Sequence, residues 1–376
     1  MDKKEQAEQF KEIVKFLGMN RESRDEALSI IMNYTATYEQ RRLWVDTEVD
    51  KHLLRVISDC IEDEPITTKA LESLINLSND KNWVESLCTL NVGRRVFEFL
   101  MHNVKPSQTS VRTQNAEIVK VQMTEEGGTT DFYEIQPEKA NSIQCAIMLL
   151  SNVSMLESGQ QHLLGSDKKT KGAIIENLTG MFTYFRHAEM FDFVANILAN
   201  VSSLKAGRCW MIENGKNVLS PAFLLLQDPE LSSIRIRHLI QVVRNLMFEY
   251  ENYEKDFIQM EIVDLLVRFL VKEHGLTENS LPESWERMKG IAAKEKFAKD
   301  VDSENTLNLL DCLMLLANSR SFLKIMEEKK IGELFEVLKI KPFGAARDRC
   351  DVIVAQIMEL SLPPQEPLEV QADDLD

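Results

Sequence analysis

The chain has 376 residues, with 44 lysines and arginines against 60 aspartates and glutamates, which gives a formal net charge of −16. Apolar residues make up 44%, and only 14 glycines and 10 prolines occur. Because helices tolerate few of either residue, this composition predicts a folded, helix-rich protein. The acidic balance argues against a general nucleic-acid or anionic-membrane binder, since both need clustered lysines and arginines.

The beginning of the chain leads into a charged helical pattern without the apolar core of a signal peptide. The longest apolar runs, Cys145–Leu150 and Cys312–Ala317, are six residues long, far short of the roughly 20 that span a bilayer. We therefore expect a cytoplasmic protein that does not enter membranes.

The six cysteines are scattered and include no C-x-x-C pair. Several lie in apolar helical stretches, where cysteine behaves as a small hydrophobic residue. Metal ligation would need paired spacing with histidine nearby, and the sequence has no such cluster. The chain also has no P-loop, dinucleotide-binding, zinc-protease or nucleophile-elbow motif. We therefore expect a non-enzymatic protein with no catalytic residue, no cofactor and no metal.

A recurring string organises the chain: aliphatic residues at helical spacing, then asparagine, an apolar residue and often serine or threonine. The copies, in chain order, are Ile30–Thr35, Leu74–Ser78, Leu149–Ser154, Leu198–Ser202 and the looser Val242–Leu246 and Leu315–Ser319. Their asparagines are separated by 43, 76, 48, 45 and 73 residues. Three of these spacings lie in or beside the roughly 40–47 residue period of armadillo and HEAT units. The pattern predicts one all-α, armadillo/HEAT-like superhelical repeat domain of about six units over residues 1–360.

The two long spacings each equal one unit plus an insertion of about 30 residues. The first insertion, about residues 105–138, interrupts the helical pattern, and Ile118–Val121 and Phe132–Ile135 within it suggest a β-hairpin or a loop. The second, about residues 272–303, is charged and includes a stretch typical of a short solvated helix. Residues 361–376 carry three prolines and five acids but no base, which predicts a disordered acidic tail.

Five N-x-S/T triplets occur, and the repeat explains four of them better than glycosylation does. They start at Asn33, Asn76, Asn152, Asn177 and Asn200. An asparagine at this position points either into a groove, where its amide can bind the backbone of an extended peptide, or into the stack of helices. Both alternatives remain open from the sequence.

Aromatic and arginine side chains are the other candidates for contact with a partner. Trp210 is expected in the core, and Trp285 is expected to be exposed in the second insertion. Phe248 belongs to an aromatic cluster with Tyr250, Tyr253 and Phe257, which forms either a partner-facing patch or a packed turn. The candidate partner-binding residues are Asn76, Asn152, Asn200, Arg244, Asn245, Phe248 and Trp285.

Several segments, in order along the chain, resemble the Hgh-one family of armadillo-like eukaryotic cytosolic proteins. The most specific is Val243–Glu249, which resembles the family's Arg-Asn-x-x-Phe segment. The others are Val194–Ser202 with the following Gly207 and Arg208, then Leu281–Glu283, Leu313–Leu316 and Ala346–Asp351. The resemblance covers roughly residues 140–360 and marks the chain as a divergent member.

This resemblance implies an adaptor or co-chaperone that delivers newly made translation elongation factor 2 to the cytosolic chaperonin. Its partners would be proteins, without nucleic acid or membrane, and we expect a monomer. The alternatives are an importin-type transport receptor that binds basic peptides in a concave groove, and a purely structural scaffold. The importin-type alternative requires exposed, regularly spaced asparagines and tryptophans, yet tryptophan accompanies no repeat regularly.

Overall fold

The computed structural model describes residues 3–107, 132–228, 230–273, 303–338 and 344–360, which are almost entirely helical. These residues fall into two compact units. The first comprises Met1–Leu225 and Glu230–Asn245, and the second comprises Leu226–Pro229 and Leu246–Asp376.

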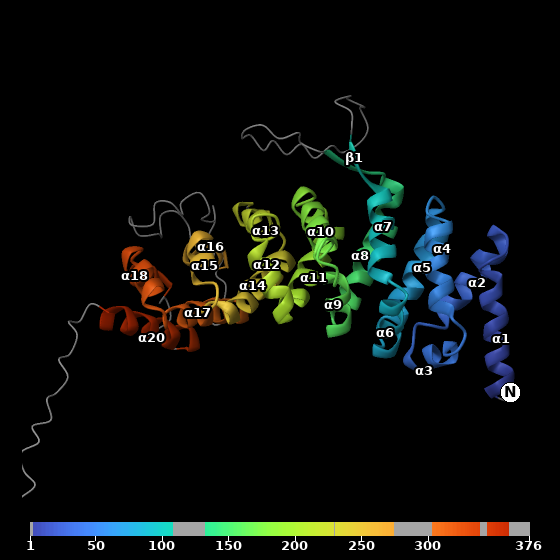
Figure 1. Cartoon of the computed structure of the whole chain (residues 1–376), viewed down its shortest axis with the longest axis horizontal. Coiled ribbons are helices and arrows are strands. Elements are labelled where there is room, and N and C mark those ends of the chain that lie inside the picture. Colours follow the sequence, from blue (N-terminus) through green and yellow to red (C-terminus); the bar gives the residue numbers. More distant parts are fainter. Residues whose placement is uncertain (1–2, 108–131, 229, 274–302, 339–343, 361–376) are drawn as a thin grey trace, which may run out of the picture. The chain divides into compact units, whose positions relative to one another are not determined.

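In the first unit the helices follow one another through short connections (Figure 1). Its α-helices are α1 (Lys3–Phe16), α2 (Arg21–Asn33), α3 (Tyr38–Arg41), α4 (Val49–Asp59), α5 (Glu64–Leu77), α6 (Lys81–Thr89), α7 (Val92–Asn103), α8 (Ala140–Ser154), α9 (Glu157–Leu164), α10 (Ala173–Tyr184), α11 (Asp192–Ser203), α12 (Lys205–Glu213), α13 (Leu219–Leu224) and α14 (Ser233–Leu246), whose last residue begins the second unit. Short 3-10 turns are η1 (Arg42–Trp44), η2 (Pro137–Lys139), η3 (Glu189–Phe191) and, running into the second unit, η4 (Leu225–Gln227).

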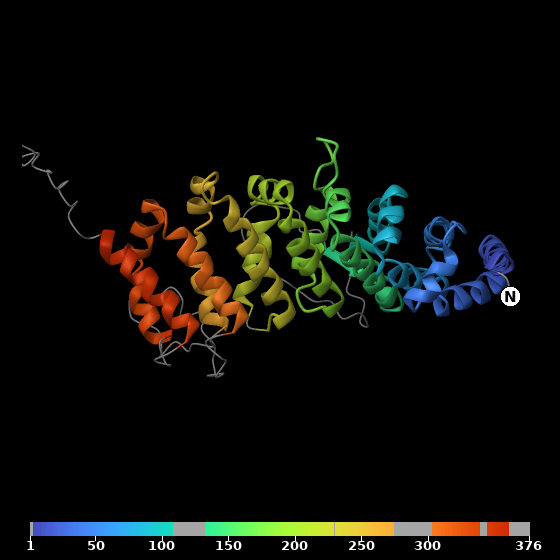
Figure 2. The ribbon, with the colours of Figure 1, turned by 90° about the horizontal axis from the view of Figure 1, so that it is seen from below.

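Helices α2, α5, α8 and α11 form a row in which each helix packs against the next. Near the helix starts, Lys69 of α5 donates to Asp25 of α2 at 2.6 Å, and Ser142 of α8 donates to Glu64 of α5 at 2.6 Å. In Figure 1, α4, α7 and α10 lie along one side of this row and α6 and α9 along the other, and Figure 2 shows the same succession in a second view.

The row forms because each of its helices carries a continuous apolar stripe. In α5 the fully buried residues Ile66, Ala70, Leu71, Leu74 and Leu77 recur at helical spacing. The helix ends follow local chemistry. Asn20, for example, caps α2 by accepting from the backbone N–H of Ser23. The predicted all-α, armadillo-like repeat is thus built from short amphipathic helices that share one core.

The first insertion begins where the sequence predicts a break. Helix α7 ends at Asn103, and strand β1 (Val104–Ser107) pairs antiparallel with strand β2 (Phe132–Ile135). Strand β2 is where it was predicted, but its partner in the structure is β1 rather than Ile118–Val121, which lies outside the described residues. The partner strand contains Pro106, which cannot continue a helix but is tolerated in an edge strand.

The second unit contains η5 (Met247–Glu249), α15 (Glu254–Gln259), α16 (Ile262–Glu273), α17 (Glu304–Leu316), α18 (Arg320–Glu328), α19 (Ile331–Leu338) and α20 (Ala345–Leu360). Here α17 packs against α20, and Arg349 donates to Asp311 across this pair at 2.5 Å. Most of the second predicted insertion and all of the predicted acidic tail lie outside the described residues.

Candidate protein-binding face

Asn76, Asn152, Asn200 and Asn245 form a ladder of hydrogen bonds between consecutive repeats, which we call the asparagine ladder. In each case the amide Nδ2 donates to a hydroxyl at the end of the preceding helix of the row. Asn76 donates to Thr35 at 3.2 Å, Asn152 to Ser78 at 3.0 Å, Asn200 to Ser154 at 2.9 Å and Asn245 to Ser202 at 3.0 Å. The ladder extends the row to α14.

The hydroxyl that accepts each bond also donates one. Ser154 Oγ donates to the carbonyl of Ser151 at 2.7 Å, and Ser202 Oγ donates to the carbonyl of Ala199 at 2.7 Å. A serine or threonine hydroxyl has one donor and two acceptor sites, so it serves both its own helix end and the next repeat. This double role accounts for the serine or threonine of the four triplets that belong to the repeat, namely Thr35, Ser78, Ser154 and Ser202.

The ladder uses the Nδ2 atom of each asparagine and leaves the Oδ1 atom outside these hydrogen bonds. All four asparagines are half-buried, and the Oδ1 atoms of Asn152 and Asn200 are neither buried nor hydrogen-bonded to any described residue. One turn earlier, Asn196 donates to Ser151 Oγ at 2.8 Å. The side-chain oxygens of Asn152 on α8 and Asn200 on α11 can therefore accept hydrogen bonds from a ligand. The Nδ2 atoms of these residues already donate to serine hydroxyls of neighbouring helices. The second predicted alternative, a role in the helix stack, accounts for the nitrogens.

Two glycines let the following helix pack closely against the C-terminal end of a helix of the row, α9 against α8 and α12 against α11. A Cβ at Gly159 of α9 would lie 1.8 Å from the carbonyl oxygen of Val153, and one at Gly207 of α12 would lie 2.1 Å from that of Val201. Each glycine follows its ladder asparagine by seven residues. Only glycine fits here, because the contact is with rigid backbone.

The remaining candidates lie in different environments. Arg244 is exposed near the end of α14, and Asn245 is a rung of the ladder. Phe248 belongs to the second unit and is 66% exposed. Its neighbour Phe257 is fully buried, so the aromatic cluster is partly surface and partly packed turn. Trp285 lies outside the described residues.

Trp210 is buried, as predicted. Its indole packs over Gly172, where an added Cβ would lie 1.8 Å from the ring. Because Gly172 has a φ of +78°, the left-handed region that favours glycine, the backbone and the ring contact both require this residue.

Sequence reasoning did not identify the fully buried Arg235 of α14. Its guanidinium donates to Asp192 at 2.6 Å and to the carbonyls of Phe182, Phe185 and Ala188 at the end of α10 and beyond. It also lies over the ring of Phe182, 4.5 Å from the centroid. Arg235 and Arg237 look alike in the string Ser-Ile-Arg-Ile-Arg. Arg235 lies on the helix face that also buries Leu239 and Val242, and its ion-pair partner Asp192 lies 43 residues earlier, whereas Arg237 is exposed.

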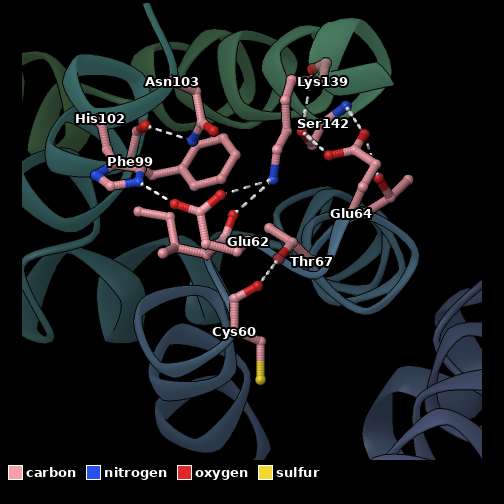
Figure 3. Close-up of polar contacts among 11 residues, drawn as sticks. Cys60, Glu62, Glu64, Thr67, Phe99, His102, Asn103, Lys139 and Ser142 are labelled. Carbon is pink, nitrogen blue, oxygen red and sulfur yellow. Dashed lines mark hydrogen bonds and ion pairs between the residues drawn. The ribbon is translucent and has the colours of Figure 1, made fainter. Parts of the chain in front are cut away.

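A second polar network lies where the first insertion leaves and rejoins the helices (Figure 3). Glu62, in the turn between α4 and α5, contacts His102 of α7 at 2.7 Å and forms an ion pair with Lys139 at 3.7 Å. The buried Lys139 also donates to the carbonyl of Ile61 at 3.0 Å. Ser142 binds both oxygens of Glu64. Residues on both sides of the insertion are thus tied to the turn between α4 and α5, close to the start of β1 and the end of β2.

The titratable groups of the described residues show no catalytic arrangement. Burial raises the pKa of the Cys145 thiol to about 11 and also raises the pKa of Cys60 and Cys88. These thiols are therefore neutral at physiological pH. Among the residues that the structure describes, no cluster of three or more His, Cys, Asp or Glu side chains could hold a metal ion. No described helix is both long and apolar enough to cross a membrane.

Comparison with known proteins places the chain among armadillo repeats. Residues 134–286 match the model of a family described as "Domain of unknown function (DUF383)". No curated protein matches the chain. A designed armadillo repeat protein in complex with the peptide (KR)4 is similar over 81% of this chain and 98% of its own, with 13% identity and a TM-score of 0.54.

Two further solved structures are less similar. Another designed armadillo repeat protein covers 93% of this chain and 99% of its own, with 11% identity and a TM-score of 0.47. A chain from a study of the interaction between cadherin and beta-catenin covers 93% and 69%, with 12% identity and a TM-score of 0.48. The fold is that of an all-α, armadillo-like repeat protein.

Proposed function

We propose that this chain is a non-enzymatic, cytoplasmic adaptor that assists the folding of translation elongation factor 2 together with the cytosolic chaperonin. The observation that carries the proposal is the segment Val243–Glu249. It has the most specific resemblance to the Hgh-one family, and it lies within residues 134–286, which match the model described as "Domain of unknown function (DUF383)". In the structure this segment forms the end of α14 and η5 and exposes Arg244 and Phe248.

The surface chemistry supports protein binding. Arginine and aromatic side chains dominate the energy of many protein interfaces, and the armadillo-like row holds Arg244 on a rigid helix. The designed armadillo repeat protein that is similar to this chain was solved in complex with the peptide (KR)4, which supports a protein-binding role for this chain.

Affinity capture tests the proposal. Tagged full-length chain is incubated with native lysate, and bound elongation factor 2 and chaperonin subunits are identified by mass spectrometry. We expect both with the wild type, and less of both with Arg244→Ala/Phe248→Ala. The variant Lys168→Ala/Lys169→Ala, in an exposed loop between α9 and α10, serves as the matched control. Capture of neither protein by the wild type would overturn the proposal.

The importin-type alternative ranks second. It needs asparagine amides that can both donate to and accept from a peptide backbone, whereas the ladder already uses Nδ2 of Asn76, Asn152, Asn200 and Asn245. A basic peptide would also meet two exposed arginines on α14. Tight binding of a basic peptide such as an Arg-Lys repeat would favour this alternative.

A further inference from the structure

Helix α14 carries positive charge that its own sequence does not balance. Its 14 residues, SIRIRHLIQVVRNL, include three arginines and no acid. Arg235 is neutralised in the core by Asp192. Arg237 and Arg244 remain, in a chain whose formal net charge is −16.

These two arginines differ from the many helical bases that have an acid one turn away. Arg237 and Arg244 are exposed, and neither forms an ion pair with any residue that the structure describes. Their i±3 and i±4 neighbours are all uncharged. Bases that are paired within a helix are Lys81 with Glu85, Arg55 with Asp59, Arg94 with Glu98 and Arg347 with Asp351. The unbalanced charge of α14 is therefore a local property of this helix.

Arg237 and Arg244 lie on one stripe of the helix surface. They are seven residues apart, or two turns, which places them on the same face about 10 Å apart along the axis. Gln241 lies between them, and Ile234, 46% exposed, extends the stripe toward the start of the helix. The buried contacts of Arg235 hold the helix in one rotation, so the backbone that carries the stripe is already ordered before a partner binds.

We propose that the stripe of Ile234, Arg237, Gln241 and Arg244 binds an acidic segment of a partner protein in extended conformation. Charge complementarity selects the occupant, because each guanidinium can bind a carboxylate through two parallel N–H groups. In the polyproline II form of an extended chain, three residues span about 9 Å and bring the side chain back to the same face, so carboxylates three residues apart match the two arginines. Gln241 then lies opposite the peptide backbone, and Ile234 contacts an apolar residue beside the acids.

This inference deepens the proposed function, on which it rests, by naming the chemistry of the client segment. Its test uses a purified component and does not depend on the identity of the client. The full-length chain is titrated into a fluorescein-labelled peptide of twelve residues in which glutamate recurs at every third position. A second probe replaces each glutamate with glutamine, and binding is followed by fluorescence anisotropy.

We expect the wild type to bind the glutamate probe and not the glutamine probe, with affinity that falls as salt rises. R237E/R244E should weaken binding by about tenfold or more. R237K/R244K should retain part of it, since lysine keeps the charge but not the paired N–H geometry. The control K168E/K169E changes the net charge equally on an exposed loop and should stay within about twofold of the wild type. Urea midpoints confirm that all variants are folded.

Equal binding of the glutamate probe by wild type and R237E/R244E would overturn the inference, as would an equal loss in the control. So would binding only of a peptide with the sequence of residues 361–376, since the occupant would then be the chain's own acidic tail. A dimer that R237E/R244E dissociates would assign the stripe to a second copy and also overturn the inference.

Capture of elongation factor 2 is scored separately. Its absence with the wild type would overturn the proposed function, and equal capture by R237E/R244E would contradict the inference alone.

Discussion

At the residue scale, single atoms decide how consecutive repeats meet. Asn200 donates from Nδ2 to Ser154, and Ser154 donates in turn to the end of its own helix. Just beyond, Gly207 lets α12 pass within contact of the carbonyl of Val201. A side chain one carbon larger has no room there, because the opposing atom belongs to the backbone rather than to a flexible side chain.

Gly207→Ala should therefore destabilise the protein by roughly 1–3 kcal/mol, since the new Cβ forces α12 away from α11. Gly180→Ala is the matched control. Gly180 also lies within a helix, but an added Cβ there meets nothing within 4 Å, so alanine should be neutral or stabilise by up to about 1 kcal/mol. Urea unfolding followed by circular dichroism measures both. Similar midpoints for the two variants would contradict the close approach at Gly207.

At the element scale, helices separated by about 40 to 70 residues in sequence are joined by a few buried or half-buried polar groups. Arg235 of α14 links to Asp192 of α11 and to the carbonyls at the end of α10. His162 of α9 accepts from the backbone N–H of Gly93 in α7 at 3.1 Å. In both cases a side chain satisfies backbone groups at a helix end, which would otherwise be buried without partners.

Removing the buried guanidinium takes the ion-pair partner from Asp192, which then keeps only the hydroxyl of Ser232, and one donor from each of three carbonyls. Arg235→Met should cost about 3–5 kcal/mol in the free energy of unfolding, because an unpaired buried carboxylate is strongly unfavourable. Arg237→Met, two positions along the same helix, removes an exposed arginine and should change stability by less than about 0.5 kcal/mol. Calorimetry or denaturant unfolding of the two variants tests this difference. A mild effect at Arg235 would show that its network contributes little net stability.

Acid should weaken the contact between α7 and α9. Burial lowers the pKa of His162 below its ordinary value. A protonated imidazole also cannot accept from Gly93, since both ring nitrogens are then donors. A histidine with a lowered folded pKa contributes stability above its unfolded pKa of about 6.5. That contribution is lost as pH falls through the folded pKa.

Urea midpoints of wild type and His162→Gln between pH 7.5 and pH 5 measure this effect. We expect the wild type to lose more stability over the range than the variant, which has no titrating group at residue 162. His238, whose pKa burial also lowers, titrates in both proteins and cancels in the comparison. Parallel pH dependences would assign the acid sensitivity to other groups.

At the scale of the whole molecule, the armadillo-like repeat makes most contacts between neighbours. In such arrays stability is approximately a sum of repeat and nearest-neighbour terms. Each ladder rung lies between two consecutive helices of the row, such as α8 and α11. A substitution at one rung should therefore lower the local stability mainly of the two helices that this rung connects.

Asn200→Ala should accelerate native-state hydrogen exchange in α8 and α11, with α17 and α20 of the second unit exchanging as in the wild type. Hydrogen exchange with mass spectrometry measures each helix separately. A uniform acceleration in both units would mean that the chain opens as one cooperative body.

Much of the fold followed from local patterns. The aliphatic-asparagine-serine string predicted the repeat, because the apolar residues of a helix's buried face recur every three to four residues and are therefore visible in a short stretch of sequence. Strand β2 was predicted at Phe132–Ile135, but its partner was not, since pairing depends on which segment lies beside it after folding. The candidate residues Arg244 and Phe248 are exposed, whereas the sequence could not tell that Nδ2 of Asn200 is used between repeats.

The sequence by itself determined that this protein is an all-α repeat with a period near 45 residues and a formal net charge of −16. Helical spacing, scarce glycine and proline, and the recurrence of one string are all short-range properties. Only the tertiary structure decided that Arg235 is buried while Arg237 is exposed, and that the unbalanced charge of α14 forms one stripe. Those outcomes depend on groups some 40 residues apart, such as Asp192 and Arg235, whose contact exists only after the helices have packed.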